Sequence, residues 1–274
     1  MNILLIEATN KLISLSRIYE WNKELLEKAP PVLWFGNSNS GKDKILTFGA
    51  NPSRWEFLKQ KQSTLPAKKV YLTGINKRFR HLDNNQSYSD IISNAHLQED
   101  IINSFNDYFI KNPYKWFGKN KNEPYNVEGF LKGMDASYYD KETKYQALHI
   151  DLFPFVTISD FNKIKTIAER DVFSNNWAKN FIDELLFKLN PKAILIFGRA
   201  NFNYFCKFDG IEKGYSNKLT FKKTNKTECS CDYWICNYNN YQTFGLSTNL
   251  GNPKGFDAVA LEDLGKEMKI KLCS

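Results

Sequence analysis

The stretch KILTFGANPS, residues 44–53, joins a short apolar run to a loop that contains Gly49, Asn51 and Pro52. The apolar run includes a β-branched isoleucine, a threonine and a phenylalanine, which predicts a buried strand. The glycine and proline that follow it predict a tight turn with a restricted backbone. In parallel α/β sheets, ligands bind at the carboxyl ends of the strands. This loop is therefore the first candidate for a functional site.

A second glycine pattern, Gly36-x4-Gly41-Lys42, lies just upstream and is formally similar to a phosphate-binding loop. A phosphate-binding loop needs Ser or Thr after its lysine to hold Mg²⁺, and a helix directly behind it. Here Asp43 follows the lysine, and the next residues predict a strand. The sequence therefore predicts a turn that joins two strands as a hairpin, and it disfavours a nucleotide hydrolase.

Length and composition predict one soluble domain. The chain has 274 residues, of which 42% are hydrophobic, and this is enough for one substantial core. No run approaches the roughly 18 apolar residues of a membrane span, and the apolar start is too short for a secretory signal. We expect a cytoplasmic monomer with a helical extension over residues 1–30 and a β-rich insertion over residues 201–241. The odd set of five cysteines predicts reduced thiols.

The charge balance indicates a polyanionic partner. The formal net charge is +8 and the pI is about 9.0, and such a surface attracts nucleic acid. The 21 Phe, 14 Tyr and 6 Trp residues supply many rings on which bases can stack. A solvated, lysine-rich surface without a partner is the alternative. We expect DNA as the partner and no membrane contact.

Hydrophobic periodicity predicts alternating helices and strands. Helical patterns cover residues 10–26, 89–110 and 171–189, and another helix begins near Ser159. Strand patterns cover residues 44–48, 70–73, 147–153 and 193–197. Alternation of this kind predicts an α/β fold with a largely parallel sheet.

The ends of four predicted strands carry motifs in a particular order: KILTFGANPS (44–53), ALHIDLFPF (147–155), AILIFGRAN (193–201) and FGLSTNLGNPKGF (244–256). This order resembles the uracil-DNA glycosylase superfamily, from about Val32 to the C-terminus. In that family a strand opens into a Gly-x-Asp/Asn-Pro loop, a second ends in a base-reading Asn, a third ends in Gly, and a fourth opens into His-Pro-Ser-Pro. The resemblance implies a three-layer α/β/α sandwich around a mostly parallel, four-stranded sheet. It also implies a DNA glycosylase, which extrudes a base before cutting it from its sugar.

The resemblance assigns roles to individual residues. Asn51 orients the attacking water, and Asp151 stands at the base-reading position, so these two are the expected catalytic residues. The expected base-binding residues are Gly49, Ala50, Pro52 and Ser53, with Phe79 and Trp116 as stacking aromatics. The expected DNA-binding residues, with Leu250 as the wedge left in the base stack, are Arg78, Ser247, Thr248, Asn249, Leu250, Asn252 and Lys254.

Three departures from the family pattern suggest the substrate. Ser53 replaces a tyrosine that blocks the C5 edge of the base, so a large C5 substituent has room. The family histidine corresponds to Ser247 or has no counterpart near that position, and we expect His149 to be a core residue. An ionised Asp151 only accepts hydrogen bonds, so it favours the cytosine amino group, with a proton shared with cytosine N3. The resemblance thus points to the branch that excises hydroxymethylated or glucosylated cytosine from phage DNA.

Other interpretations of the same residues remain open. Asn51 can simply bond its own turn, and Asp151 can cap the loop that follows it. A uracil or damaged-base repair glycosylase is one alternative function, and a catalytically inactive DNA-binding protein of the same fold is another. The spacing Cys229-x-Cys231-x4-Cys236, with Cys273, matches neither common zinc nor ferredoxin patterns. We therefore expect no metal and no cofactor.

Overall fold

The structure is a computed structural model that describes residues 1–59, 69–111, 113, 117, 127–139, 142–174, 176–207, 211, 216–250 and 255–273. In it the chain forms two compact units. The first, here called the helical unit, comprises Met1–Phe35, Ala50–Pro113 and Asp151–Lys188. The second, here called the sheet unit, comprises Gly36–Gly49, Tyr114–Ile150 and Leu189–Ser274.

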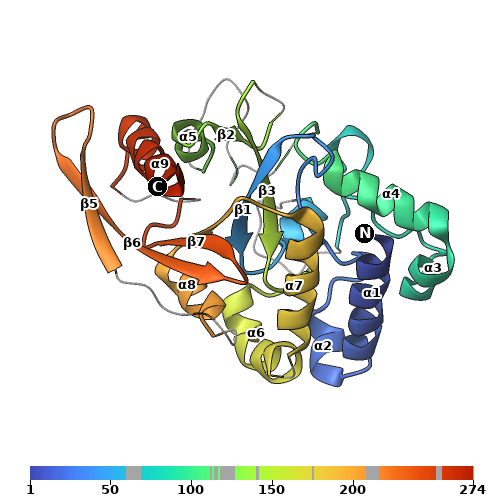
Figure 1. The fold of residues 1–274 in the computed structure, drawn as a ribbon. Coiled ribbons are helices and arrows are strands. Elements are labelled where there is room, and N and C mark those ends of the chain that lie inside the picture. The colour runs from blue at the N-terminus through green and yellow to red at the C-terminus, as the bar shows by residue number, and fades with distance from the viewer. Residues whose placement is uncertain are drawn as a thin grey trace. The chain divides into compact units, whose positions relative to one another are not determined.

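One mixed sheet of seven strands, in the order β2-β3-β1-β4-β7-β6-β5, forms the sheet unit (Figure 1). β1 and β7 both run parallel to β4, and β2 runs parallel to β3. β6 is antiparallel to β7, and β5 is antiparallel to β6. The strands are β1 (Asp43–Gly49), β2 (Ala136–Ser137), β3 (Tyr145–Asp151), β4 (Ala193–Phe197), β5 (Ser216–Lys222), β6 (Glu228–Tyr238) and β7 (Tyr241–Leu246).

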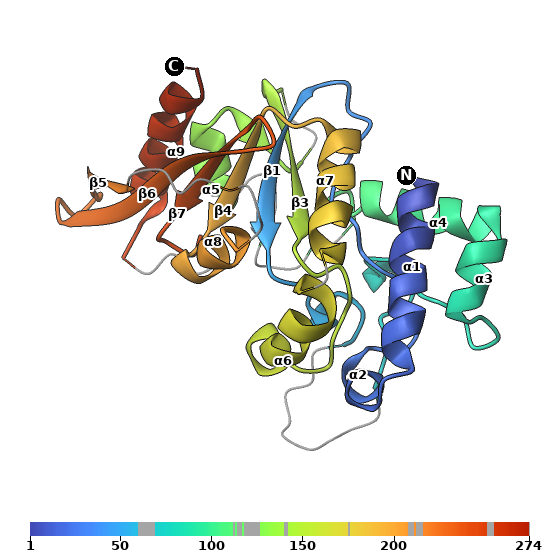
Figure 2. The same cartoon turned by 60° about the horizontal axis from the view of Figure 1, so that its bottom comes forward.

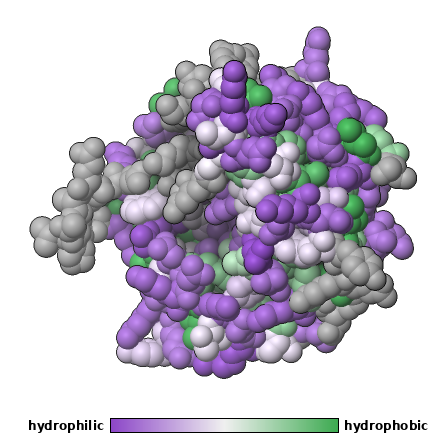
Figure 3. Space-filling view, turned by 90° about the vertical axis from the view of Figure 1, so that its left-hand side faces the viewer, coloured by the Kyte–Doolittle hydropathy of each residue, from purple (hydrophilic) through white to green (hydrophobic). Residues whose placement is uncertain are grey.

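The position of each strand in the sheet follows from its sequence. β4 reads AILIF, and all five of its side chains are buried, as expected for a strand covered on both faces. β5 lies at the edge of the sheet and is mostly exposed, with lysines at 218 and 222. Lysines on an edge strand discourage pairing with another chain. The molecular face on this side carries mainly hydrophilic side chains (Figure 3).

Helices cover both faces of this sheet. α5 (Val127–Gly133) and α9 (Ala258–Cys273) lie on one face, and α8 (Arg199–Phe205) lies on the other (Figures 1 and 2). α5 and α9 cross closely at two glycines, since a Cβ added at Gly265 would lie 2.0 Å from the carbonyl oxygen of Phe130. On the opposite face, Gly245 of β7 makes room for the ring of Phe202.

The helical unit consists of short helices around an aromatic core. Its elements are α1 (Asn2–Ser16), α2 (Tyr19–Glu24), the 3₁₀ turns η1 (Arg54–Glu56) and η2 (Gly74–Asn76), α3 (Tyr88–Ser93), α4 (Ala95–Asn106), α6 (Phe161–Ala168), the π-helical turn η4 (Glu169–Phe173) and α7 (Trp177–Leu189). The core includes the buried rings of Phe35, Phe57, Phe79, Phe105 and Tyr108. None of the helices in the described part of the chain is long and apolar enough to cross a membrane.

The α/β class is confirmed, but two finer predictions are wrong. The sheet has seven strands rather than four, because β2 is added at one edge, and β5 and β6, which come from the β-rich insertion predicted over residues 201–241, extend it at the other. The hairpin predicted ahead of β1 is absent, because residues 31–34 form no strand. Pro31 has no amide to donate, and the Val32 amide donates to the Pro154 carbonyl at 2.8 Å instead of to a neighbouring strand.

The observed helices differ from the predicted ones mainly in where they begin and where they divide. The pattern over residues 89–110 divides into α3 and α4, because the Asn94 side chain accepts from the Leu97 amide at 3.1 Å and begins a second helix. The N-terminal pattern over residues 10–26 begins earlier, at Asn2, and divides into α1 and α2 without a side-chain cap at the start of α2. The strand over residues 193–197 has the predicted bounds.

Candidate functional site

The loop that follows β1 is held by backbone and side-chain contacts of the helical unit. The Ala50 carbonyl accepts a hydrogen bond from the Phe153 amide at 3.0 Å, which ties this loop to the chain that follows β3. The Ser53 hydroxyl accepts from the Trp55 amide at 3.3 Å and caps η1. Pro52 is buried, while Gly49 and Asn51 are partly exposed. The loop thus presents Asn51 from a restrained backbone.

Hydrogen bonds fix the orientation of the Asn51 side-chain amide. Its Nδ2 atom donates to Thr157 Oγ1 at 3.0 Å, and the Thr157 hydroxyl in turn donates to the Ser159 carbonyl at 2.7 Å. A hydroxyl has one hydrogen, so Thr157 can only accept from Asn51, and the amide nitrogen must face it. Among the described residues, Asn51 Oδ1 has no hydrogen-bond partner. This carbonyl is therefore available to accept a hydrogen bond from water.

Two buried carboxyl groups belong to the same unit. Asp151 is the last residue of β3 and is 4% exposed, and Glu56 ends η1 and is 2% exposed. The Tyr108 hydroxyl donates to Glu56 Oε2 at 2.8 Å. Arg78 Nη1 lies 3.8 Å from the same oxygen. The Glu56 carboxyl thus has one hydrogen-bond donor and one cation beside it.

The environment of Glu56 changes its ionisation. Burial raises the pKa of Glu56 to about 7, and the nearby Asp151 carboxylate adds to this rise. The Arg78 cation and the hydrogen bond from Tyr108 act in the opposite direction. Because burial outweighs them, Glu56 is partly protonated near neutral pH. Glu56 can therefore hold a proton at a pH where ordinary carboxyls have lost theirs.

Sequence reasoning missed Glu56. Its only local signal is the pattern SRWEF, residues 53–57, in which a single carboxylate stands between two aromatic residues. Trp55 of this stretch was also missed. It is partly exposed, and the Arg54 guanidinium lies 4.7 Å from the centre of its ring. Trp55 is therefore an aromatic side chain near Asn51 along the chain that retains some exposed surface.

The predicted stacking aromatics have different outcomes. Phe79 is 1% exposed, and its ring stacks on those of Phe57 and Tyr108, with centroids at 5.6 and 4.9 Å. It is thus a core residue without an exposed face for a base. Trp116 lies outside the described residues.

Arg78, predicted to contact DNA, points into the protein. Its Nη1 atom donates to the Trp55 carbonyl at 2.6 Å and lies near Glu56. The side chain is 17% exposed. In this structure its charge acts on the Glu56 carboxyl.

The predicted DNA-binding loop belongs to the sheet unit. Its start is anchored by the Gly198 amide, which donates to the carbonyls of Leu246 and Thr248 at 2.9 and 3.1 Å. The Ser247 hydroxyl accepts from the Asp232 amide at 2.9 Å. Asn249 is exposed, whereas Leu250 is fully buried, so it does not project as a wedge. Asn252 and Lys254 lie outside the described residues.

One histidine of the sheet unit is buried in the core, and three of its cysteines lie on a strand. The prediction that His149 is a core histidine is confirmed, because it is 4% exposed and its Nδ1 lies 2.9 Å from Thr47 Oγ1. On β6, Cys229 and Cys231 occupy odd positions and Cys236 an even one, so they face opposite sides of the strand. Within the described ranges, no group of three His, Cys, Asp or Glu side chains is arranged to hold a metal.

Comparisons of this chain with protein-family models, with curated proteins and with solved structures give no match. A functional interpretation therefore depends on the residues themselves.

Proposed function

We propose that this protein is a monofunctional DNA glycosylase that removes a cytosine with a large C5 substituent, such as hydroxymethylcytosine or its glucosylated form. Its product is an abasic site, and destruction of modified phage DNA is the use we infer for it. One observation carries the proposal: the Asn51 carbonyl has a fixed orientation and is open to accept a hydrogen bond from water. The chain's resemblance to the uracil-DNA glycosylase superfamily supports the same chemistry.

Asn51 orients the attacking water molecule. A base inside a duplex cannot be reached, so the enzyme extrudes the nucleotide first. Asn51 Oδ1 then accepts a hydrogen bond from water and directs the water oxygen toward the sugar C1′ atom. As the new C1′–O bond forms, the C1′–N1 bond breaks and its electron pair leaves with the base. One hydrogen of the water stays on the new C1′ hydroxyl, and the other leaves to solvent as a proton.

The carboxyl pair serves the base. Asp151 accepts from the cytosine amino group, and a proton held by Glu56 is shared with cytosine N3. With this proton on N3, the base leaves as a neutral molecule, which lowers the barrier to bond cleavage. Glu56 supports this role, because its pKa of about 7 keeps a proton beside Asp151 near neutral pH.

Two further features support the proposed substrate and family. Ser53 has a small side chain whose hydroxyl already caps η1, so it leaves room for a C5 substituent. Helices on both faces of the sheet, α8 on one and α5 with α9 on the other, support the three-layer α/β/α architecture of the superfamily.

The test is to incubate the protein with three duplexes that carry unmodified, hydroxymethylated or glucosylated cytosine, without added metal or nucleotide, and to measure alkali-labile sites. We expect cleavage only of the modified duplexes. Asn51→Ala should abolish excision and leave DNA affinity unchanged, whereas Asn22→Ala, an exposed residue of α2, should behave as wild type.

Other outcomes would contradict the proposal. Release of uracil from a uracil-containing duplex, with no release of modified cytosine, would indicate a repair enzyme. Tight binding of every duplex without excision would indicate an inactive DNA-binding protein. Normal excision by Asn51→Ala would remove the catalytic assignment of that residue.

A further inference from the structure

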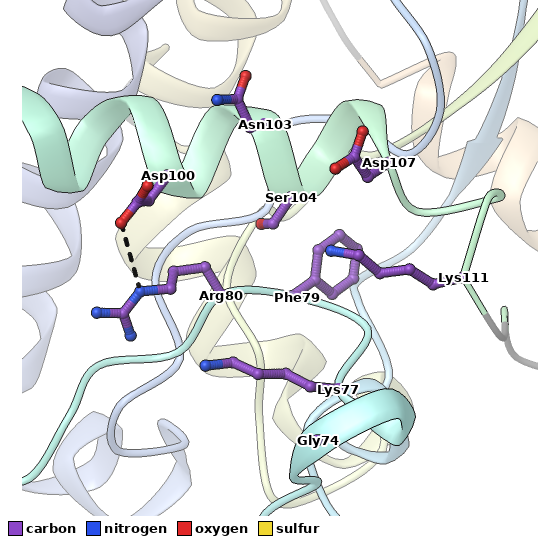
Figure 4. Close-up of a pocket in the computed structure, with 9 residues that line it drawn as sticks. All are labelled: Gly74, Lys77, Phe79, Arg80, Asp100, Asn103, Ser104, Asp107 and Lys111. Atoms are coloured by element: carbon purple, nitrogen blue, oxygen red, sulfur yellow. Dashed lines mark ion pairs between the residues drawn. The ribbon is translucent and has the colours of Figure 1, made fainter.

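A cleft of about 390 Å³ lies in the helical unit beside η2 and α4 (Figure 4). Its charged residues and its side-chain amide are Lys77, Arg80, Asp100, Asn103, Asp107 and Lys111. An adjoining hollow of similar volume shares Gly74, Lys77 and Lys111 with it and adds two isoleucines, Ile75 and Ile110. Neither hollow contains a residue to which the sequence assigned a role, except the buried Phe79.

The cations of this cleft are not equally neutralised. Arg80 Nη2 lies 2.9 Å from the Asp83 carboxylate, and Arg80 Nε lies 4.0 Å from Asp100. By contrast, the ammonium groups of Lys77 and Lys111 make no hydrogen bond and no ion pair with the described residues. Figure 4 shows both lysine side chains extending over the space between η2 and α4. Neither lysine is therefore directly paired with a described residue, although the Asp100 and Asp107 carboxylates also line the cleft.

The electrostatic environment of Lys77 indicates an excess of positive charge. Burial lowers the pKa of Lys77, and the Arg80 and Lys111 cations lower it further. Asp83 and Asp100 act against this effect without removing it. A bound anion would relieve the repulsion between these cations.

The lining as a whole carries three cations, Lys77, Arg80 and Lys111, against two carboxylates, and it adds a neutral donor. Asn103 is exposed on α4, and its side-chain amide has no partner among the described residues, so it can donate. Asp107, also on the rim, is exposed and stands four residues before Lys111. An exposed ion pair between these two would contribute little, so it would not compete strongly with a ligand.

Two apolar side chains distinguish this cleft from a simple phosphate site. Ile75 is 92% exposed and Ile110 is 78% exposed, and both line the hollow that shares the lysines. A free phosphate ion has no use for such side chains. A nucleic-acid strand presents apolar sugar surface next to each phosphate, so it matches both the lysines and the isoleucines.

We propose that Lys77 and Lys111 bind a backbone phosphate of the DNA, and that Ile75 and Ile110 contact the adjoining deoxyribose. This inference rests on the proposed function, because it takes DNA as the ligand. Lys77 precedes Arg78 in an extended segment, where successive side chains point in opposite directions. Since Arg78 points toward Glu56, Lys77 points away from it, and the phosphate bound at Lys77 does not belong to the extruded nucleotide.

The experiment measures the affinity for a labelled duplex carrying modified cytosine at several salt concentrations. The variant Lys77→Gln/Lys111→Gln should bind more weakly at low salt. Its slope of log K against log salt should be smaller by about 1 to 2, because each phosphate contact releases about one counterion. Lys77→Arg/Lys111→Arg keeps both charges and should retain the wild-type slope. Ile75→Ala/Ile110→Ala should lower the affinity at every salt concentration without changing the slope.

A matched control removes the same charge elsewhere. Lys188→Gln/Lys192→Gln alters two exposed lysines outside the cleft, one in the last turn of α7 and the other just before β4. This control should keep the wild-type slope. If Lys77→Gln/Lys111→Gln binds with the slope and affinity of the control, the cleft does not bind DNA and the inference is overturned.

Failure of this inference can be told apart from failure of the proposed function. Wild-type excision of modified cytosine, together with unaltered DNA binding by Lys77→Gln/Lys111→Gln, would overturn the inference alone. Absence of excision on every duplex, together with the reduced slope, would overturn the glycosylase proposal and support the cleft as a DNA contact. Unfolding temperatures of the variants close to the wild-type value would show that their folds are intact.

Discussion

The Glu56 carboxyl should make the protein less stable as the pH rises, and Glu56→Gln should remove this effect. Burial raises the pKa of Glu56 from 4.5 to about 7. A carboxyl with a raised folded pKa holds its proton more tightly in the folded than in the unfolded state, so stability falls as the pH rises between these values. At about 1.4 kcal/mol for each pKa unit, the full loss is about 3 kcal/mol.

The comparison of Glu56→Gln with wild type isolates the contribution of Glu56 ionisation to the free energy of unfolding. Below pH 4 to 5, the carboxyl is protonated in both states and contributes no pH dependence. Gln is neutral at every pH, and its carbonyl oxygen can still accept from Tyr108. Any constant cost of the substitution cancels when two pH values are compared. Between about pH 4 and pH 8, the free energy of unfolding of Glu56→Gln should therefore gain about 3 kcal/mol relative to wild type.

The assay is urea denaturation followed by tryptophan fluorescence at a series of pH values. Glu99→Gln is the control, because Glu99 is an exposed carboxylate on α4. Its stability difference from wild type should change little with pH. A Glu56→Gln difference that is equally independent of pH would show that Glu56 titrates like an exposed carboxylate, and its proposed role as a proton holder would be refuted.

Three further substitutions test the site and the fold. Asp151→Asn should lower single-turnover excision of modified cytosine roughly tenfold to hundredfold, because about 1–3 kcal/mol of base contact is lost. Some excision of uracil should be gained. An unchanged rate on modified cytosine would exclude Asp151 as the residue that reads the base. Thr157→Val should lower excision about threefold to tenfold, because the Asn51 amide loses one hydrogen bond. Thr157→Ser keeps the hydroxyl and should keep the wild-type rate. Equal rates for both variants would contradict the role of Thr157 in orienting Asn51. Gly265→Ala should destabilise the sheet unit by about 1–3 kcal/mol in urea denaturation, since its Cβ would lie 2.0 Å from the Phe130 carbonyl oxygen; a stability equal to wild type would show that α5 and α9 separate without cost.

The elements that the sequence predicted well have strong local patterns. β4 is a continuous apolar run between Lys192 and Gly198, and its bounds match the predicted strand. The position of Asn51 after β1 also follows from the sequence, because glycine and proline mark the turn. Both features depend on residues that are neighbours along the chain.

The features that the sequence missed depend on residues distant along the chain. The unusual pKa of Glu56 requires burial, and its partners Arg78 and Tyr108 come from other segments of the helical unit. The orientation of Asn51 depends on Thr157, which lies beyond β3. No local pattern in the sequence reports such contacts. For the same reason, the sequence did not show that β5 and β6 continue the sheet that contains β4.

The basic segment KRFR, residues 77–80, illustrates why charge in a sequence overstates contact with DNA. Arg78 is directed at Glu56, and Arg80 is paired with Asp83. Only Lys77 of these three cations lacks an ion pair within the described part of the chain. A cation that already neutralises a carboxylate releases few counterions from DNA, whereas each lysine on a phosphate adds about 0.9 to the salt slope. The segment should therefore contribute about one phosphate contact rather than three, and the other two charges act on the folded protein, where Arg78 limits the rise in the pKa of Glu56.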